Sequence, residues 1–177
     1  MVGDSQTGET QKFDGPYYLL RAMDARSGPV HAQWGRTGAP MNVVPVDFIV
    51  EAILAGVREP SATGETLHLV DPAPIDAVSM QRILMREYLG REPNLVFPLG
   101  PATSLLRVRP VRRLMNGVPA ESLRYLQHEV VYDVTRATEI LGRAGVACPR
   151  FADYAPAVVG FYRAHKDDPA YRPAHER

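Results

Sequence analysis

Apolar residues recur at helical spacing in several separate parts of the chain. Between Val46 and Val57 they stand at positions 46, 49, 50, 53, 54 and 57, which predicts a helix with a wide buried face. Asp76 is suited to cap a helix that ends at Leu89, because Gly90 follows it as a C-terminal stop. Further helices are predicted over Tyr17–Met23, Ala102–Met115, Ala120–Leu126, Thr135–Ala144 and Tyr154–His165.

Compact apolar runs of strand length lie between these helices. Strands are predicted at Met41–Pro45, Thr66–Val70, Leu95–Leu99 and Glu129–Tyr132. Residues 67–70 are apolar at three of their four positions, which is typical of a strand buried on both faces of a parallel sheet. The chain contains too few strands to build that sheet, so we expect its partners in sequence that is absent here. The alternation predicts an α/β fold rich in helices.

Composition and charge narrow the classes of partner. Twenty basic and twenty acidic residues cancel, and the pI is near 7.0, so nothing electrostatic favours nucleic acid. No apolar run approaches the roughly 18 residues of a membrane span, and residues 1–10 lack a signal-peptide pattern. Cys148 is the only cysteine, so no internal disulfide forms, which fits a reducing compartment. We expect one cytoplasmic domain.

Several polar and apolar segments carry a family resemblance when taken in order. They are Val2–Glu9, Asp14–Tyr18, Asn42–Ala52, Thr66–Pro72 and Tyr132–Pro149. Together they resemble the extended short-chain dehydrogenase/reductases, of the NAD-dependent epimerase/dehydratase superfamily. The Asp14–Tyr18 loop resembles the branch that contains thioester reductases and fatty acyl-CoA reductases (male sterility proteins).

The resemblance implies an incomplete domain. It places residues 1–165 in the C-terminal, substrate-side part of a Rossmann-type fold, a helix-rich region with few short strands, and leaves the nucleotide-binding half absent. Residues 166–177 are polar with two prolines and are expected to form a disordered tail.

The family's chemical machinery is missing from this sequence. The parent enzymes hold NAD(P) with a glycine-rich loop near the N-terminus, and no G-x-G-x-x-G pattern occurs here. The one Tyr-x-x-x-Lys spacing, Tyr162 to Lys166, lies at the far end of the chain, so we interpret it as a surface tyrosine beside a helix-ending lysine. We expect no catalytic residue, no cofactor binding by this chain alone, and leave open whether it is an enzyme.

Two sets of residues are candidates for contact with ligands. By the resemblance, the loop after the first strand end borders the nicotinamide and substrate, and an ordinary surface turn is the alternative; its polar positions are Gly3, Asp4, Ser5 and Thr7. A basic cluster could meet the phosphates of coenzyme A or an acidic carrier protein, and a solvated helix face is the alternative; it comprises Arg107, Arg109, Arg112 and Arg113. Asp47 is predicted to cap its own helix.

Histidine and cysteine offer no further site. The five histidines and Cys148 show no metal-ligand spacing, and Cys148 lacks the neighbourhood that activates a thiol nucleophile. His68 falls within the strand predicted at Thr66–Val70 and is interpreted as a core or edge residue. We expect no metal site.

Three hypotheses for function stay open at this point. The first is a fragment of an NAD(P)-dependent reductase that supplies the pocket and lid for a small-molecule acyl thioester or related carbonyl, inactive alone. The second is a fragment of a nucleotide-sugar epimerase or dehydratase. The third is a non-enzymatic interaction module that pairs with a separate nucleotide-binding chain or with itself.

Overall fold

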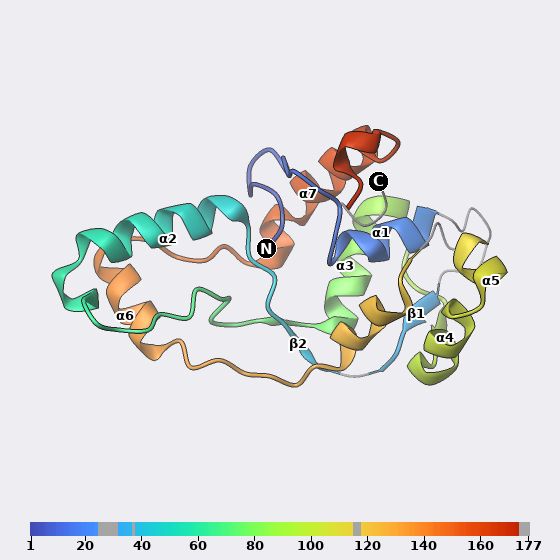
Figure 1. Cartoon of the computed structure of the whole chain (residues 1–177), viewed down its shortest axis with the longest axis horizontal. Coiled ribbons are helices and arrows are strands. Elements are labelled where there is room, and N and C mark those ends of the chain that lie inside the picture. The colour runs from blue at the N-terminus through green and yellow to red at the C-terminus, as the bar shows by residue number, and fades with distance from the viewer. Residues whose placement is uncertain (25–31, 37, 115–117, 174–177) are drawn as a thin grey trace.

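The computed structural model describes residues 1–24, 32–36, 38–114 and 118–173 (Figure 1). The α-helices are α1 (Tyr17–Asp24), α2 (Val46–Arg58), α3 (Ala77–Leu89), α4 (Leu99–Leu106), α5 (Arg109–Leu114), α6 (Thr135–Arg143) and α7 (Phe151–His165). The 3-10 helices are η1 (Pro60–Ala62), η2 (Ala120–Gln127) and η3 (Pro169–Tyr171). The strands are β1 (Ala32–Trp34), β2 (Pro40–Met41), β3 (Ile75–Asp76) and β4 (Leu95–Phe97).

The larger part of the molecule, here called the body, is built on α3. This helix packs against both α1 and α7, and it begins where predicted because the Asp76 carboxylate accepts hydrogen bonds from Val78 N and Ser79 N. It ends at Gly90, whose φ of 65° is the left-handed conformation that glycine adopts readily. Met80 and Leu84 are fully buried between the helices. The predicted boundaries of this helix are confirmed.

Two small sheets support the body. β1 pairs in parallel with β4, and β2 pairs antiparallel with β3. The strand predicted at Leu95–Leu99 is therefore confirmed in a shorter form, whereas β1 lies where no strand was predicted. Gln81 explains the position of β1, because its side chain accepts from Trp34 N at 2.8 Å and donates to Trp34 O at 3.0 Å.

Two predicted strands do not form among the described residues. Residues 66–70 and 129–132 lie in no helix, strand or bridge, and His68 is exposed instead of buried. A strand needs a neighbour to take its backbone hydrogen bonds, and no other strand lies beside either segment in the described part of the chain. The predictions of strands at Thr66–Val70 and Glu129–Tyr132 were wrong for this chain taken alone.

Helices α2 and α6 form a second region, here called the lobe, which extends away from the body at the left of Figure 1. Its core is small and consists of Val44, Phe48, Ala52, Ala55 and Leu141. Polar contacts fasten α6 to the η1 turn: Arg136 donates to Ser61 O at 2.9 Å, and Arg143 donates to Ser61 Oγ at 3.1 Å.

The C-terminal segment differs from the predicted disordered tail. Residues 166–173 fold back onto the body, where Lys166 Nζ lies 2.5 Å from Asp24 Oδ1 and Phe13 N donates to Tyr171 O at 2.8 Å. The Tyr171 ring stacks on Phe13 with 5.1 Å between the ring centroids, within the range of about 4.5–7 Å that is typical of aromatic pairs. One aromatic anchor thus orders a segment whose composition is otherwise polar. The rest of the predicted tail, residues 174–177, lies outside the described residues.

The remaining helices follow the sequence with local changes. The helix predicted from Ala102 to Met115 is split into α4 and α5, and residue 115 lies outside the described residues. The segment from Ala120 forms a 3-10 helix, and α6 starts at Thr135 without a side-chain cap. Asp133 takes that role from outside the helix, since its carboxylate accepts from Thr135 N at 2.9 Å.

Candidate functional site

A cavity of about 560 Å³ opens between Met1, the turn at residues 14–16, α1, β2, α3 and η2. It is lined by Met1, Asp14, Gly15, Pro16, Tyr18, Leu19, Met41, Asn42, Val43, Met80, Pro119, Ser122, Tyr125 and Leu126. Most of these side chains are apolar, and a few polar groups lie among them. This composition and size are typical of a site for a small organic ligand.

One wall of the cavity is the loop that leads into α1. Gly15 has a φ of 57°, which lets the chain turn sharply before Pro16 opens the helix. Tyr18 N then donates to Gly15 O at 3.1 Å. The Asp14–Tyr18 segment that carried the resemblance to acyl reductases therefore lies at the cavity.

The opposite wall is held by a buried tyrosine of α7. Tyr154 Oη donates to Val43 O at 2.8 Å, and burial raises the pKa of this phenol well above its ordinary value. The neutral hydroxyl is thereby kept as a donor to the backbone that carries Asn42 and Val43 into the cavity. Its role is to position this wall.

The polar groups of the cavity suit binding better than acid–base catalysis. Asp14 pairs with Lys12 at 2.7 Å, and Ser122 Oγ donates to Pro119 O at 2.6 Å. Neither group lies in a serine–histidine or Tyr–Lys arrangement within the described residues. The cavity can therefore hold and orient an apolar ligand.

The N-terminal loop predicted to border the substrate does not line the cavity. Gly3 N donates to Tyr17 Oη at 3.1 Å, so this hydrogen bond fixes the loop to α1. The next residue of α1, Tyr18, lines the cavity. Asp4 accepts from Gln6 N and Thr7 N, both at 2.9 Å, and these hydrogen bonds lower the pKa of its carboxyl. The contact of this loop with substrate stays a prediction.

Asp47 connects this loop to α2. Ser5 N donates to its Oδ1 at 2.9 Å, and Ser5 Oγ donates to its Oδ2 at 2.5 Å. The N-cap of α2 is Pro45, without a side-chain hydrogen bond, so Asp47 does not cap its own helix as predicted. It sits in the first turn, where a negative charge is favourable, and satisfies the loop instead.

The same loop does not fit the dinucleotide that the parent family binds. Every backbone N–H from residue 3 to residue 8 already donates to an acceptor within the protein. A pyrophosphate cradle requires such donors to be available. At Gly8, which has a φ of 74°, a Cβ would lie 2.1 Å from Ala157 O, so this glycine serves close packing on α7. The backbone N–H groups of residues 3–8 are therefore not available to a pyrophosphate.

The predicted basic cluster lies on the outside of α4 and α5. Arg107, Arg109 and Arg113 are exposed, and the side chain of Arg112 lies outside the described ones. None of these three exposed arginines lines the cavity. α4 nevertheless packs against η2, which supplies Ser122, Tyr125 and Leu126 to the cavity wall.

Tyr162 and Lys166 do not form a catalytic pair. Tyr162 is buried against Phe13 and Tyr88, contrary to the interpretation as a surface residue, and burial raises the pKa of its phenol. Lys166 points to the Asp24 carboxylate, which also accepts from Tyr88 Oη at 2.7 Å. The spacing reflects helix packing and an ion pair.

The remaining candidates have structural roles. His68 Nδ1 lies 3.0 Å from Asp133 O, and its ring contacts Tyr132. Burial raises the pKa of the Cys148 thiol to about 12, with Asp71 and Asp47 adding to the shift, so the reactive thiolate is disfavoured. Among residues 1–24, 32–36, 38–114 and 118–173, no three His, Cys, Asp or Glu side chains gather into a metal site.

Sequence reasoning missed most of the cavity. Met41, Met80 and Leu126 meet there from three elements, and nothing distinguishes them locally from ordinary core residues. Only the Asp14–Gly15–Pro16 turn carried a visible signal.

Comparison with known proteins supports the fold. The chain matches the terminal R domain from the myxalamid PKS-NRPS biosynthetic pathway with a TM-score of 0.68 and 22% identity, over 97% of this chain and 43% of that one. It matches gox2253 with a TM-score of 0.55 and 18% identity, over 93% of this chain and 47% of that one. No family model and no curated protein matches the sequence.

The chain spans less than half the length of each of these two structures. Within the described ranges, no helix has the length and apolar character needed to cross a bilayer. The similarity confirms the predicted fold class: this chain is a helix-rich α/β protein with few short strands, and over 97% of its length it shares its fold with part of that terminal R domain.

Proposed function

We propose that this chain is the substrate-side part of an NAD(P)-dependent reductase that acts on an acyl thioester or a related carbonyl compound. It supplies the cavity and the covering helices, and the cofactor and proton-transfer groups come from a nucleotide-binding part. Alone it binds substrate without turning it over. The observation that carries this proposal is the largely apolar cavity beside the Asp14–Tyr18 loop, within a fold shared with a terminal R domain.

The walls of the cavity favour an acyl chain over a sugar. Met41, Val43, Met80 and Leu126 offer hydrocarbon and thioether surface, which gains free energy by covering an alkyl chain. A sugar would need several convergent hydrogen-bond partners, and the polar side chains here are few.

The basic cluster suits the other end of such a substrate. Arg107, Arg109 and Arg113 are exposed and lie outside the cavity. Arg107 follows α4, which packs against η2, and the other two belong to α5, which packs against α4. A phosphorylated arm that leaves the cavity past η2 would meet guanidinium groups, which bind phosphate well. An acyl group on coenzyme A or on a phosphopantetheine carrier has this arrangement of apolar and anionic ends.

The first experiment measures ligand binding by titration calorimetry of the purified chain with decanoyl-CoA and with UDP-glucose. Met41→Trp should weaken decanoyl-CoA binding at least about tenfold, because the larger side chain occupies the half-buried cavity wall. Leu95→Trp is the matched control, since Leu95 is an exposed residue of another short strand outside the cavity. Binding of UDP-glucose in preference to decanoyl-CoA would favour the nucleotide-sugar alternative and contradict the proposal.

A second experiment tests whether the isolated chain catalyses reduction. Incubation of the isolated chain with NADPH and decanoyl-CoA should give no oxidation of NADPH at 340 nm, because the backbone N–H groups of residues 3–8 are not available to a pyrophosphate. Sustained NADPH-dependent turnover by the purified chain would contradict the proposed role.

A further inference from the structure

The candidate cavity is open at one end and closed at the other. Met1 and Tyr125 are 68% and 66% exposed, so they stand at its mouth. Met80 and Leu126 also line it but are 0% and 2% exposed, so they form its floor. A ligand that fills the cavity therefore enters past the first pair of side chains and ends against the second pair.

The chemical character of the lining changes along this depth. The polar side chains Asp14, Asn42 and Ser122 are half-buried, whereas the floor presents the thioether of Met80 and the alkyl group of Leu126. An apolar group gains most from the part of a site that is removed from water. A polar group is better placed nearer the mouth, where it keeps its hydrogen bonds. The gradient therefore favours entry of an acyl compound with its alkyl tail first.

Helix α3 fixes the backbone of Met80 at the floor. Met80 directly follows Ser79, whose N–H donates to the Asp76 cap, and α3 packs against both α1 and α7. Met80 belongs to the main hydrophobic core and to the cavity lining, whereas Leu84, one helical turn further on, is part of the core but not of the lining. The side chain of Met80 thus separates the cavity from the interior of the body.

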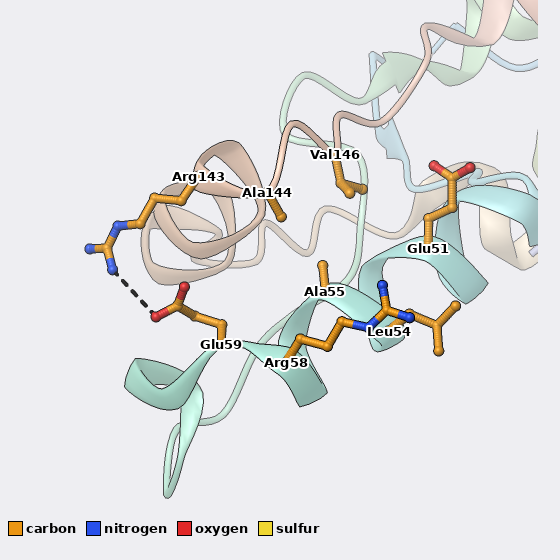
Figure 2. A pocket seen from close by; sticks show the side chains of 8 residues that line it. All are labelled: Glu51, Leu54, Ala55, Arg58, Glu59, Arg143, Ala144 and Val146. Carbon is orange, nitrogen blue, oxygen red and sulfur yellow. Dashed lines mark ion pairs between the residues drawn. The ribbon is translucent and has the colours of Figure 1, made fainter.

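A second hollow, of about 300 Å³ between α2 and the end of α6, has a different lining. Figure 2 shows Glu51, Arg58, Glu59 and Arg143 around it, and the Arg143–Glu59 ion pair spans 3.8 Å. Charged side chains lose hydration when an alkyl chain covers them, which opposes binding. The cavity with Met80 at its floor is therefore better suited to an alkyl chain than this hollow is.

We infer that Met80 sets the length of the acyl chain that the cavity accepts, which makes it a specificity-determining residue of the proposed reductase. This inference rests on the proposed function. Each methylene that the cavity covers should raise the affinity about fourfold, from the transfer free energy of a buried CH₂ group. The gain stops at the chain length whose terminal methyl group meets Met80, because further carbons overpack the floor or remain in water.

The test measures binding of the purified chain to hexanoyl-, octanoyl-, decanoyl-, dodecanoyl- and tetradecanoyl-CoA by titration calorimetry. For the wild type, the affinity should rise with chain length up to a limit and then level off. Met80→Ala should move this limit about two carbons towards longer chains, because the Cγ, Sδ and Cε atoms no longer fill the floor. Its affinity for the first compound beyond the wild-type limit should exceed that of the wild type about tenfold.

The matched control is Leu84→Ala, at a residue of the same helix that is 1% exposed, against 0% for Met80. It removes an equally buried side chain outside the cavity lining, so it should lower the stability of the protein and leave the chain-length limit unchanged. Met80→Val is the milder second variant and should move the limit about one carbon in the same direction. Circular dichroism monitors the folding of each variant.

Three outcomes would overturn the inference. They are a wild-type affinity that keeps rising through tetradecanoyl-CoA, an unchanged limit in folded Met80→Ala or Met80→Val, and an equal shift of the limit in Leu84→Ala. If the acyl-CoA compounds bind but the limit does not move with Met80, the inference fails and the proposed function stands. If none of the compounds binds to the wild type, the proposed function itself is rejected.

Discussion

The body and the lobe of this protein bury their helices to different extents. In the body, α3 is enclosed by α1, α7 and the β1–β4 sheet, and residues such as Met80 and Leu84 are fully buried. In the lobe, one side of α2 is buried in a core of five residues. The opposite side carries an apolar stripe that remains in solvent, made of Val50, Ile53, Leu54 and Val57. The body contains the candidate cavity, whereas α2 of the lobe carries these four exposed large apolar side chains.

This difference indicates that the two regions contribute differently to the stability of the isolated chain. The free energy of folding of the isolated chain comes mainly from the body, where apolar area is removed from water on all sides. The outer surface of the lobe contributes little until something covers it. Substitutions of residues buried in the body should therefore destabilise the isolated chain more than substitutions on the outer surface of the lobe.

Leu84→Ala should have the largest effect. The side chain is 1% exposed between α3 and its neighbours, so its loss leaves a cavity and should cost about 2–5 kcal/mol of unfolding free energy. Urea denaturation followed by circular dichroism measures this. A loss below about 1 kcal/mol would show that the body is not the main source of stability.

Tyr154→Phe should cost less, about 1–2 kcal/mol, because it leaves the buried Val43 carbonyl without its donor. It should also weaken decanoyl-CoA binding, since Val43 lines the cavity. Phe151→Leu, a change at a buried residue of the same helix without a hydrogen bond to the cavity wall, is the control for binding. Equal affinity of the wild type and Tyr154→Phe for decanoyl-CoA would show that this hydrogen bond does not contribute to ligand binding in the cavity.

Asp76→Ala should cost about 1 kcal/mol through loss of the α3 cap. Burial raises the pKa of this carboxyl, but hydrogen bonds from Ser79 and Val78 outweigh it and lower the pKa below 3.8. The charge-dependent stabilisation is therefore fully present above that value and is lost as the pH falls through 3.8 toward the lower folded pKa. Asp76→Asn should retain the cap and make the stability of the protein less sensitive to acid. Thermal unfolding measured at pH 3 and at pH 6 tests this.

Val57→Ser should have the smallest effect, within about 0.5 kcal/mol, because the side chain is already in solvent. The same urea titration measures it. A cost comparable with that of Leu84→Ala would mean that the stripe of α2 is covered within the isolated chain, for instance in a homodimer, and would remove the contrast between body and lobe.

Local sequence signals were sufficient for the bounds of two helices. The apolar period of residues 46–57, the Asp76 cap and the Gly90 stop predicted where α2 and α3 lie, because these signals depend on neighbours within a few residues along the chain. The predicted buried face of α2 was wrong: Val50, Ile53, Leu54 and Val57 are exposed, and Phe48, Ala52 and Ala55 are buried instead. The end of the chain was mispredicted, since Tyr171 gains its order from contacts with Phe13, far away in sequence.

The sequence by itself determined the bounds of helices α2 and α3, the turn at Asp14–Pro16 and the resemblance that predicted the fold class. Only the tertiary structure decided that Met41, Met80 and Leu126 line one cavity. It also decided that the N–H groups of the N-terminal loop donate to acceptors within the protein, and that residues 66–70 form no strand pairing in the described part of the chain. The physical reason is range: caps and periodicity act within one or two helical turns, whereas cavities and strand pairing require residues that are distant along the chain or belong to another polypeptide.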